Sequence, residues 1–395
     1  MRIRTFLSIL VIILTFQLNA RPARHVNVTL TQPDGSTFTA SCVGDEFMKI
    51  IKTADGHAIA RDEDGWWCYA IYEPDGSKTS SGIHIGSTAP TDILKRSMDI
   101  PYSQLNARAQ ELRSAGHSEN ALPFMQRISV ATKSQTKATK HGLVILAQYK
   151  DVPFKHSRED FVNMLTKEGY KYNGATGSAM EYFNAQFGNS VDFSFEVSEI
   201  VTLPSNRKYY GENNNYGQDA RPAEMIYDAC IGADPSIDFS LYDDDNDGYV
   251  DNVFVFFAGG DEAELFEQED LIWSHAWYME SGGGLALKLD GKSIDRYACT
   301  AELSYNALAG IGTFCHEYSH TFGLPDFYDT DYDENGWSAG LWCWTSLMDG
   351  GNMNNTSNTP PFYNAIEREL MDIADPILID RDGTYTLEPL HSMCR

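Results

Sequence analysis

Two histidines and a glutamate with the spacing of a metal site lie in the segment CHEYSHTFGLPDFYD, residues 315–329. His316 and His320 are four residues apart, so on a helix both imidazoles lie on one face and can bind a single metal ion. Glu317 lies to one side of that pair, where its carboxylate can accept a proton from a zinc-bound water molecule. The alternative interpretation is a helix that carries two unrelated histidines.

The residues that follow His320 favour the metal site. Gly323 is predicted to end the helix with a left-handed turn, and Pro325 cannot continue it. Asp326 then lies ten residues after His316, where the returning chain can supply a third zinc ligand. The pattern HExxHxxGxxD has the layout of metzincin peptidases, with Asp in place of the commoner His. An acidic residue elsewhere in the chain, as in thermolysin-like enzymes, is the alternative third ligand.

A methionine turn below the metal is a second feature of the metzincin layout. Met348 lies 22 residues after Asp326 and two glycines follow it closely, so we predict that it forms this turn. An ordinary core methionine is the alternative. The tyrosine that some metzincins carry on the turn is absent, because position 350 is glycine. Tyr328 and His275 are candidates for the group that assists the transition state, with packing as their alternative role.

An acidic loop, DDDNDGYVD, offers oxygen ligands for a second cation. Four carboxylates and one backbone carbonyl follow the first part of an EF-hand loop. The position that needs Glu in that motif is Phe254, and the flanking residues have strand character. We therefore predict a calcium-binding loop that is not an EF-hand, with a solvated acidic turn as the alternative. The candidate calcium ligands are Asp243, Asp245, Asp247, Tyr249 and Asp251.

Charge and the N-terminal segment narrow the class of protein. The 395 residues carry a formal net charge of −26, which argues against nucleic acid as a partner because phosphate selects basic surfaces. Two arginines precede an apolar run from Phe6 to Phe16, and Ala20 is a cleavage candidate, which is typical of a secretory signal peptide. The run is short for a bilayer span, and an N-terminal anchor is the alternative. We expect a secreted monomer without a stable membrane span.

The elements that must position these residues fall into two units. After the signal peptide (1–20), residues 21–102 contain alternating runs around Pro-Asp-Gly turns, which predict a small β-rich domain. Residues 103–140 are polar and are predicted to be a linker with an activation cleavage site. The seven cysteines are scattered without a CxxC pair, so we interpret them mostly as small core residues.

Residues 141–375 mix strands with helices, which predicts an α/β (α+β) unit with a mixed twisted sheet. Strands are expected at 142–151, 191–203 and 251–260, and a hairpin is expected to turn at Asp290-Gly291. Helices are expected at 157–169, 177–188 and 219–232, and from about Tyr305 to Phe322, where the helix carries the two histidines. Residues 376–395 are expected to begin a C-terminal β segment that is truncated.

These segments together resemble the immune inhibitor A family of secreted bacterial metalloproteases. The resemblance rests on GDEFMKIIKTADGHAIARDEDGWW near the N-terminus and on HGLVILAQYKD, GSAMEYFNAQFG, DDDNDGYVDNVFVFFAGG, IWSHAW and HEYSHTFGLPDFYD further on. It implies a zincin fold with a metzincin-like catalytic domain and a zinc endopeptidase that acts on proteins. It also implies a zymogen whose propeptide is an intramolecular inhibitor, and stabilisation by calcium. Carried over by position, His316, His320 and Asp326 are the zinc ligands and Glu317 is the base.

Two departures from the family pattern bear on activity. Members usually continue past the segment GTYTLEPL, whereas this chain stops at Arg395. The alternative function is therefore a catalytically inactive exported calcium-binding or interaction protein, derived from a truncated protease. Glu317 beside intact ligands favours the enzyme. Cys42 and Cys68 lie in the expected propeptide and could cap the zinc, but nothing in their spacing supports that role, and buried packing is the alternative.

Overall fold

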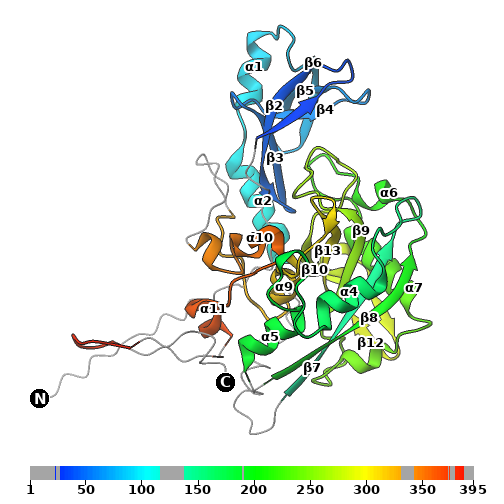
Figure 1. Ribbon diagram of the computed structural model, residues 1–395. Helices are drawn as coiled ribbons and strands as arrows, with labels where there is room; N and C mark the ends of the chain where they lie inside the picture. The colour runs from blue at the N-terminus through cyan, green and yellow to red at the C-terminus, as the bar shows by residue number, and fades with distance from the viewer. Residues whose placement is uncertain are drawn as a thin grey trace, which may run out of the picture.

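The computed structural model describes residues 23, 27–115, 138–188, 191–330, 342–371, 373 and 379–386. They form a small N-terminal unit, up to residue 115, and a larger unit that begins at residue 138 (Figure 1). The expected signal peptide (1–20) and residues 116–137 of the expected linker with its cleavage site (103–140) lie outside the described residues. Within the described ranges, no helix has both the length and the apolar character needed to cross a bilayer.

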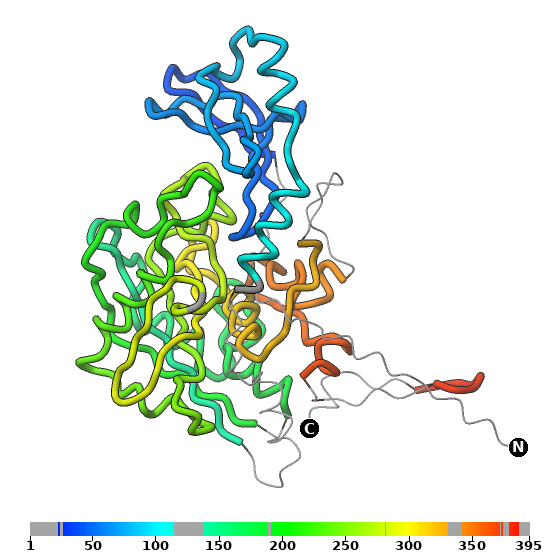
Figure 2. The backbone as a smooth tube through the Cα atoms, turned by 180° about the vertical axis from the view of Figure 1, so that it is seen from behind, coloured from blue at the N-terminus to red at the C-terminus, as the bar shows by residue number. Residues whose placement is uncertain are grey.

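Two three-stranded antiparallel sheets and two helices make up the N-terminal unit. The alternating runs on either side of the two Pro-Asp-Gly turns form hairpins, in which β1 pairs with β2 and β5 pairs with β6. A third hairpin, β2–β3, points toward the larger unit (Figures 1 and 2). The bounds are β1 (Val28–Thr31), β2 (Thr37–Asp45), β3 (Met48–Thr53), β4 (Ile59–Arg61), β5 (Trp67–Tyr72), β6 (Lys78–His84), α1 (Thr91–Met98) and α2 (Tyr102–Ala115).

The helix α2 occupies part of the segment that the sequence suggested as a linker. Residues 103–115 belong to it, and they are rich in good helix formers such as Ala, Leu, Gln and Arg. Its buried side is narrow: Leu105 and Ala109, four residues apart, pack on the β2–β3 hairpin beside Ile50. So thin an apolar stripe in a polar segment explains why the helix was not predicted.

A six-stranded mixed sheet forms the centre of the larger unit, with strand order β10-β13-β9-β7-β8 and with β14 paired to β13. The pairs β13/β9, β9/β7 and β7/β8 are parallel, whereas β10 and β14 pair with β13 in antiparallel fashion. The three predicted strands correspond to β7 (Ala138–Gln148), β8 (Val191–Thr202) and β9 (Val253–Gly260). The other strands are β10 (His275–Tyr278), β11 (Leu287–Leu289), β12 (Lys292–Ile294), β13 (Arg296–Ser304) and β14 (Ala307–Leu308).

Both faces of this sheet are buried. Along β7, Val144 and Leu146 belong to one apolar core while Leu143 and Ile145 belong to another, as expected when successive side chains point to opposite faces of a strand. Helices α4, α5 and α9 cover the first face and α7 covers the second. Five of the six described cysteines are buried, and no disulfide joins any of these six, in agreement with a packing role.

The helices of the larger unit begin at recognisable caps. Ser157 and Ser178 each form a capping box at the start of α4 and α5. The helix predicted from about Tyr305 begins later, at Ile311, because Tyr305 and Asn306 have positive φ angles and form the turn between β13 and β14. The bounds are α4 (Arg158–Thr166), α5 (Ala179–Phe187), α6 (Arg207–Gly211), α7 (Pro222–Ala233), α8 (Met279–Gly283), α9 (Ile311–His320), α10 (Asn354–Ser357) and α11 (Ala365–Leu370), with 3-10 helices η1 (Tyr172–Gly174), η2 (Phe239–Tyr242), η3 (Cys343–Thr345) and η4 (Gly350–Met353).

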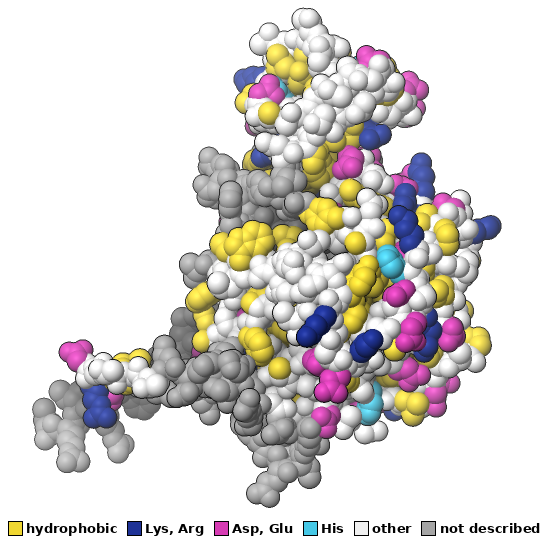
Figure 3. All heavy atoms as spheres, viewed as in Figure 1, with side chains coloured by type: hydrophobic (Ala, Val, Ile, Leu, Met, Phe, Trp, Pro, Cys, Tyr) yellow, Lys and Arg dark blue, Asp and Glu magenta, His cyan; other side chains and the backbone are white. Residues whose placement is uncertain are grey.

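The surface and the C-terminal segment add two observations. On the face in Figure 3, acidic side chains lie on both units and are interspersed with lysine and arginine. In the segment expected to begin a β structure, 376–395, the structure describes residues 379–386 and assigns no strand among them.

Candidate active site

Helix α9 carries the two histidines and is buried along its whole length. It packs against β13 and β10 on one side and against η4 on the other. The contact with η4 requires glycine at position 312, because a Cβ there would lie 2.0 Å from the carbonyl oxygen of Asn352. The helix therefore contacts both the sheet and the segment that follows Met348.

The imidazoles of His316 and His320 meet at their Nε2 atoms, which are 3.3 Å apart. The Nδ1 atom of His316 bonds to the carbonyl oxygen of Leu347 at 2.8 Å, and that of His320 to the carbonyl oxygen of Leu324 at 2.7 Å. Each carbonyl can only accept, so each Nδ1 carries a proton, and whenever the ring is neutral its Nε2 carries the lone pair. Such backbone contacts orient histidines toward a metal.

The chain reverses after α9 and brings Asp326 back to the histidines. Gly323 has a φ angle of +90°, a left-handed conformation that favours glycine and ends the helix. The carboxylate Oδ1 of Asp326 lies 3.0 Å from Nε2 of His316 and 3.7 Å from Nε2 of His320. The side chains of all three residues are inaccessible to solvent. The structure therefore brings the three predicted zinc ligands together.

Zinc fits this group of atoms. Two ligands at about 2.0–2.1 Å from a tetrahedral zinc ion are about 3.3 Å apart, and the three separations between Nε2, Nε2 and Oδ1 are 3.3, 3.0 and 3.7 Å. Two imidazoles and a carboxylate also form a common donor set for catalytic zinc. His316, Glu317 and His320 form one of the groups of the described residues whose atoms are close enough to hold a metal.

The ionisation of the free site follows from burial and from the contact between His316 and Asp326. Burial opposes a charged imidazole, but the Asp326 carboxylate outweighs it and raises the pKa of His316 to about 9. Burial raises the pKa of Asp326 to about 6 although His316 opposes the shift. Burial, followed by the charge of His316, holds the pKa of His320 well below its usual value. In the absence of metal, His316 is therefore charged at neutral pH, with a proton on Nε2 as well as on Nδ1.

Glu317 is buried beside the same atoms. Its Oε2 lies 3.9 Å from Nε2 of His320, and its side chain is fully inaccessible to solvent. At that distance the carboxylate lies next to the point where the Nε2 atoms of His316 and His320 converge, and it leaves that point free. This is the placement that a base acting on a bound water requires.

Met348 lies under the ligand loop. Its side chain is fully buried, and its carbonyl oxygen accepts a hydrogen bond of 2.7 Å from the N–H of Phe327, next to Asp326. The preceding residue, Leu347, supplies the carbonyl that orients His316. Glu367 of α11 fixes this segment, because its Oε1 accepts from the N–H of Met348 at 3.0 Å and from the hydroxyl of Ser346 at 2.6 Å. The sequence analysis did not identify Glu367, whose motif is an ordinary capping box.

The two candidates for a transition-state helper occupy different surroundings. Both nitrogens of His275 are bonded, Nδ1 to the carbonyl oxygen of Trp273 at 2.7 Å and Nε2 to the hydroxyl of Tyr297 at 2.8 Å. Burial lowers the pKa of His275 to about 4, so the ring is neutral at pH 7. Tyr328 is buried in an apolar cluster between the two units, and its hydroxyl lies close enough to Asp326 to lower the pKa of that carboxyl.

The acidic loop lies between η2 and β9, apart from the histidine group. Oxygen atoms of Asp243, Asp245 and Asp251 lie within 4.8 Å of one another. Asp243 also pairs with Lys292 at 2.6 Å, and Asp251 pairs with Lys140 at 3.0 Å. The other two candidate calcium ligands, Asp247 and Tyr249, lie in the same loop, where Asp247 accepts a hydrogen bond from the N–H of Tyr249 at 2.9 Å. A calcium ion there would compete with two lysines for carboxylates.

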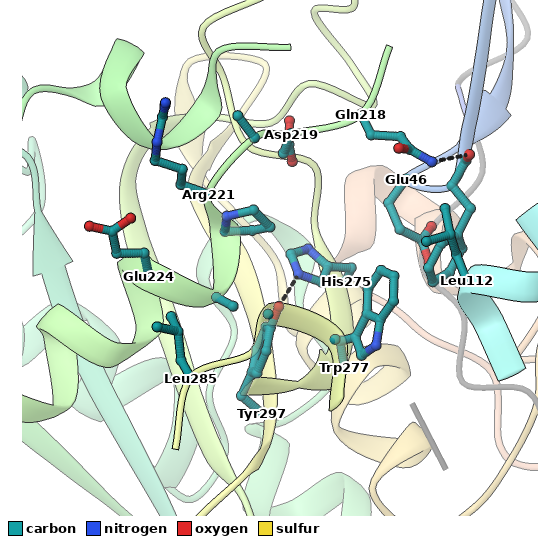
Figure 4. Close-up of a pocket in the computed structure, with 16 residues that line it drawn as sticks. Glu46, Leu112, Gln218, Asp219, Arg221, Glu224, His275, Trp277, Leu285 and Tyr297 are labelled. Carbon is teal, nitrogen blue, oxygen red and sulfur yellow. Dashed lines mark hydrogen bonds between the residues drawn. The ribbon is translucent and has the colours of Figure 1, made fainter. Parts of the chain in front are cut away.

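A pocket of about 250 Å³ lies where the N-terminal unit meets β10 and β13; we call it the junction pocket. Glu46 and Phe47, at the turn of the β2–β3 hairpin, line it together with His275, Trp277 and Tyr297. Figure 4 shows Glu46 entering from the N-terminal unit, with His275 and Tyr297 on the side of the larger unit. The sequence analysis missed Glu46, because a glutamate in a hairpin turn carries no motif. Cys42, which it considered as a zinc cap, is fully buried in β2.

The larger unit is similar to known peptidases. Residues 144–369 match the family described as "Immune inhibitor A peptidase M6, catalytic domain". The chain is 30% identical over 253 residues to "Immune inhibitor A" of Bacillus thuringiensis subsp. alesti, which covers 53% of this chain and 36% of that protein. It is 26% identical over 254 residues to "Pre-pro-metalloprotease PrtV" of Vibrio cholerae serotype O1 (strain M66-2), covering 54% of this chain and 27% of that protein. The matched region thus spans little more than a third of these relatives at most.

Proposed function

This chain belongs to the immune inhibitor A peptidase family, and from that premise we propose that it is a zinc-dependent endopeptidase that hydrolyses peptide bonds of proteins. One observation carries the proposal: Nε2 of His316, Nε2 of His320 and Oδ1 of Asp326 converge at zinc-ligand separations beside Glu317. The match covers at most 36% of the length of these relatives. The proposed activity therefore rests on the site in this chain and is not transferred from the relatives.

The residues around the site divide the chemistry between them. Zinc, when bound by His316, His320 and Asp326, supplies a Lewis acid that polarises the peptide carbonyl and acidifies water. Glu317 accepts a proton from the attacking water and delivers it to the nitrogen of the leaving amine. The carbonyls of Leu324 and Leu347 keep both imidazoles in the tautomer that can coordinate. We propose a metzincin-like arrangement, with Met348 as the buried residue below the metal.

We propose that the chain is made as a zymogen in which residues 21–102 are the propeptide, and that cleavage lies in the region 103–140. The contacts between the units support this. The ring of Phe47 lies 4.4 Å from that of Trp277 in β10, and Lys49 forms a buried ion pair with Glu262 of the larger unit. An antiparallel edge strand such as β10 can pair with an extended peptide, so a hairpin packed on it obstructs substrate.

Two further proposals concern calcium and location. The close approach of Asp243, Asp245 and Asp251 supports a calcium ion in the acidic loop, with Asp247 and the carbonyl of Tyr249 as further ligands. The N-terminal pattern in the sequence supports export by a signal peptide. We expect the exported protein to be a monomer.

Proteolysis of casein by processed protein, with and without a zinc chelator, tests the proposed activity. Cleavage that the chelator abolishes and that added zinc restores is the expected result. Mass spectrometry of the same processed material would define both termini and show whether residues 21–140 are removed. Processed protein that binds zinc but leaves casein intact would instead favour the inactive binding protein.

A further inference from the structure

A second group of metal-binding side chains lies in the N-terminal unit, at the sheet β4-β5-β6 and away from α9 (Figure 1). Asp62 directly follows β4, Cys68 belongs to β5 and His84 ends β6. One ligand atom from each of these residues lies within 4.8 Å of those of the other two. The family match covers residues 144–369 and so does not include them.

The pairing of β5 with β6 brings Cys68 and His84 side by side. They are partners in the antiparallel register, and the next pair is Ala70 with Ser80, so β6 advances by four residues where β5 advances by two. This irregularity contains Gly82, whose φ angle of +71° favours glycine. A bulge changes the direction in which neighbouring side chains point, and here it directly precedes the end of β6 that carries the histidine.

The turn between β4 and β5 presents one oxygen of Asp62 to the other two side chains. Its Oδ1 accepts hydrogen bonds from the N–H groups of Asp64 at 3.1 Å and Trp66 at 2.8 Å. Its Oδ2 lies 3.5 Å from Sγ of Cys68, which donates to it, and 3.9 Å from Nε2 of His84. The backbone of the turn therefore orients the carboxylate through Oδ1, while Oδ2 faces a thiol and an imidazole.

The imidazole of His84 is held by Trp66 of the same turn. The two rings are stacked, with centroids 4.1 Å apart and an interplanar angle of 3°. Because the lone pair of an imidazole nitrogen lies in the plane of the ring, stacking on the face leaves that lone pair available to a metal. The side chains of His84 and Asp62 are 36% and 22% exposed, so an ion can enter from solvent and retain a water ligand.

The spacing of the three side chains fits zinc. A sulfur and an oxygen ligand of a tetrahedral zinc ion are about 3.6 Å apart, close to the 3.5 Å between Sγ of Cys68 and Oδ2 of Asp62. A nitrogen and an oxygen ligand are about 3.4 Å apart. A small shift of the stacked His84 ring within its plane would close the present separation of 3.9 Å.

The donor types and their charge also fit a divalent zinc ion. Thiolate, imidazole and carboxylate are the side-chain ligands that zinc takes in proteins. When the ion binds, the thiol of Cys68 releases its proton to solvent. One thiolate and one carboxylate then balance the charge of the ion, and the imidazole remains neutral. The alternative is a metal-free sheet in which Cys68 is a buried thiol that donates to Asp62.

We propose that Asp62, Cys68 and His84 bind a second zinc ion, which cross-links the sheet β4-β5-β6. The ion joins the turn after β4 to β5 and to the end of β6. Such a link adds to a small core, because the residue opposite Cys68 is Ala60, which belongs to a cluster of three alanines, Ala58, Ala60 and Ala70. Small domains with little apolar core are commonly stabilised by a metal. This site is independent of the histidine group in α9.

The thiolate distinguishes this site from the histidine group, where the converging ligand atoms are nitrogen and oxygen. The reduced full-length chain is loaded with Co²⁺, and the near-ultraviolet charge-transfer band of a cobalt–thiolate bond is recorded. Wild type should show the band, and Zn²⁺ should abolish it by displacing the cobalt. Cys68→Ser, whose hydroxyl can still donate to Asp62, should lose the band, whereas the control Cys343→Ser, at an exposed cysteine, should keep it. A wild type without the band, or a Cys68→Ser variant that retains it, would overturn the proposal.

His84→Gln tests the same site without altering the cysteine, and serves if Cys68→Ser does not fold. Removal of the imidazole should weaken Co²⁺ binding, followed by the same band, by at least about tenfold. The matched control is His141→Gln, because the side chain of His141 is 48% exposed and lies in the larger unit. A cobalt titration of His84→Gln that coincides with that of the wild type would refute the assignment of His84 as a ligand.

Zinc content separates failure of this site from failure of the proposed function. The dialysed full-length wild type should hold about two zinc ions per chain, and Cys68→Ser and His316→Ala should each lose a different one. A single ion that is lost in His316→Ala and retained in Cys68→Ser would overturn the second site and leave the proposed function standing. A single ion that is lost in Cys68→Ser and retained in His316→Ala would support the second site and count against the proposed catalytic zinc.

Discussion

His316 and Asp326 contact each other at 3.0 Å between Nε2 and Oδ1 although a helix end and a proline separate them in the chain. The contact exists because Gly323 turns the chain back and because Phe327 is bonded to the carbonyl of Met348. The proposed metal ligands therefore come from a histidine pair on one helix and from a loop that the Met348 segment holds in place.

Asp326→Ala should weaken zinc binding by more than about 100-fold, because removal of a direct ligand exceeds the 10–100-fold effect typical of outer partners. The measurement is zinc content after dialysis, with affinity determined by competition against a chromophoric chelator. Asp234→Ala, at the exposed end of α7, provides the control and should retain full zinc. Unchanged zinc in Asp326→Ala would assign the third ligand to another acidic residue.

Zinc binding should release about one proton at pH 7, because a coordinating imidazole must be neutral. In the metal-free chain the pKa of His316 is raised to about 9 and that of Asp326 to about 6, so at pH 7 His316 holds a proton and Asp326 does not. The apparent zinc affinity should therefore fall about tenfold per unit as pH decreases from 9 to 6, and more steeply below 6. Calorimetry in buffers of different ionisation enthalpy measures the release. A heat of binding that is independent of the buffer at pH 7 would contradict it.

Glu317→Gln should lower kcat of the processed enzyme by about 10²–10⁴-fold, the usual contribution of a general base. Zinc content should not change, because Glu317 lies beside the ligands and is not one of them. Glu199→Gln is a suitable control, since that side chain is 79% exposed. Substantial residual turnover in Glu317→Gln would transfer the role of base to another group.

The local part of the site could be predicted from the sequence. The spacing of His316 and His320 sets one helix face, and Gly323 with Pro325 dictates where the helix must end. Both are short-range constraints of backbone geometry. The main strands followed from apolar runs and from alternation, and the helices α4 and α5 from segments that start at Ser and end at Gly; both serines form capping boxes.

The partners that orient the site could not be predicted, for a physical reason. Leu324 and Leu347 act through backbone carbonyls, which every residue possesses, so no residue type marks them. Glu367 fixes the Met348 segment from a helix further along the chain. Only the packing of α11 reveals this contact. The helix α2 was missed because its buried stripe is too narrow to give a clear period.

Calcium should raise the Tm of the chain if the acidic loop is a binding site, because a ligand that binds the native state stabilises it by mass action, by about 2.7 kcal/mol at 100 times Kd. Asp245→Asn should weaken this response by removing one carboxylate, whereas Asp234→Asn should not. The measurement is a calcium titration of Tm at fixed ionic strength, with magnesium as a second control cation. A flat calcium titration would leave the loop as an acidic turn neutralised by Lys140 and Lys292.

The buried ion pair between Lys49 and Glu262 links the N-terminal unit to the larger unit. Both side chains are 1% exposed, and Asn213 also donates to Glu262 at 2.7 Å. Breaking a buried pair leaves one charge without compensation, so Lys49→Met should reduce the free energy of unfolding by about 3–5 kcal/mol. Glu262→Met should have a similar effect, because it leaves the Lys49 ammonium buried.

The double substitution distinguishes a lost charge pair from lost packing. Since replacement of both partners by apolar side chains of similar volume is often nearly neutral, Lys49→Met with Glu262→Met should recover most of the loss measured by urea unfolding of the full-length chain. Lys208→Met serves as the exposed control: its pair with Glu212 has side chains 73% and 52% exposed, so its effect should stay within about 0.5 kcal/mol. Additive losses in the double variant would mean that the two charges contribute independently and that the hairpin is held mainly by the packing of Phe47.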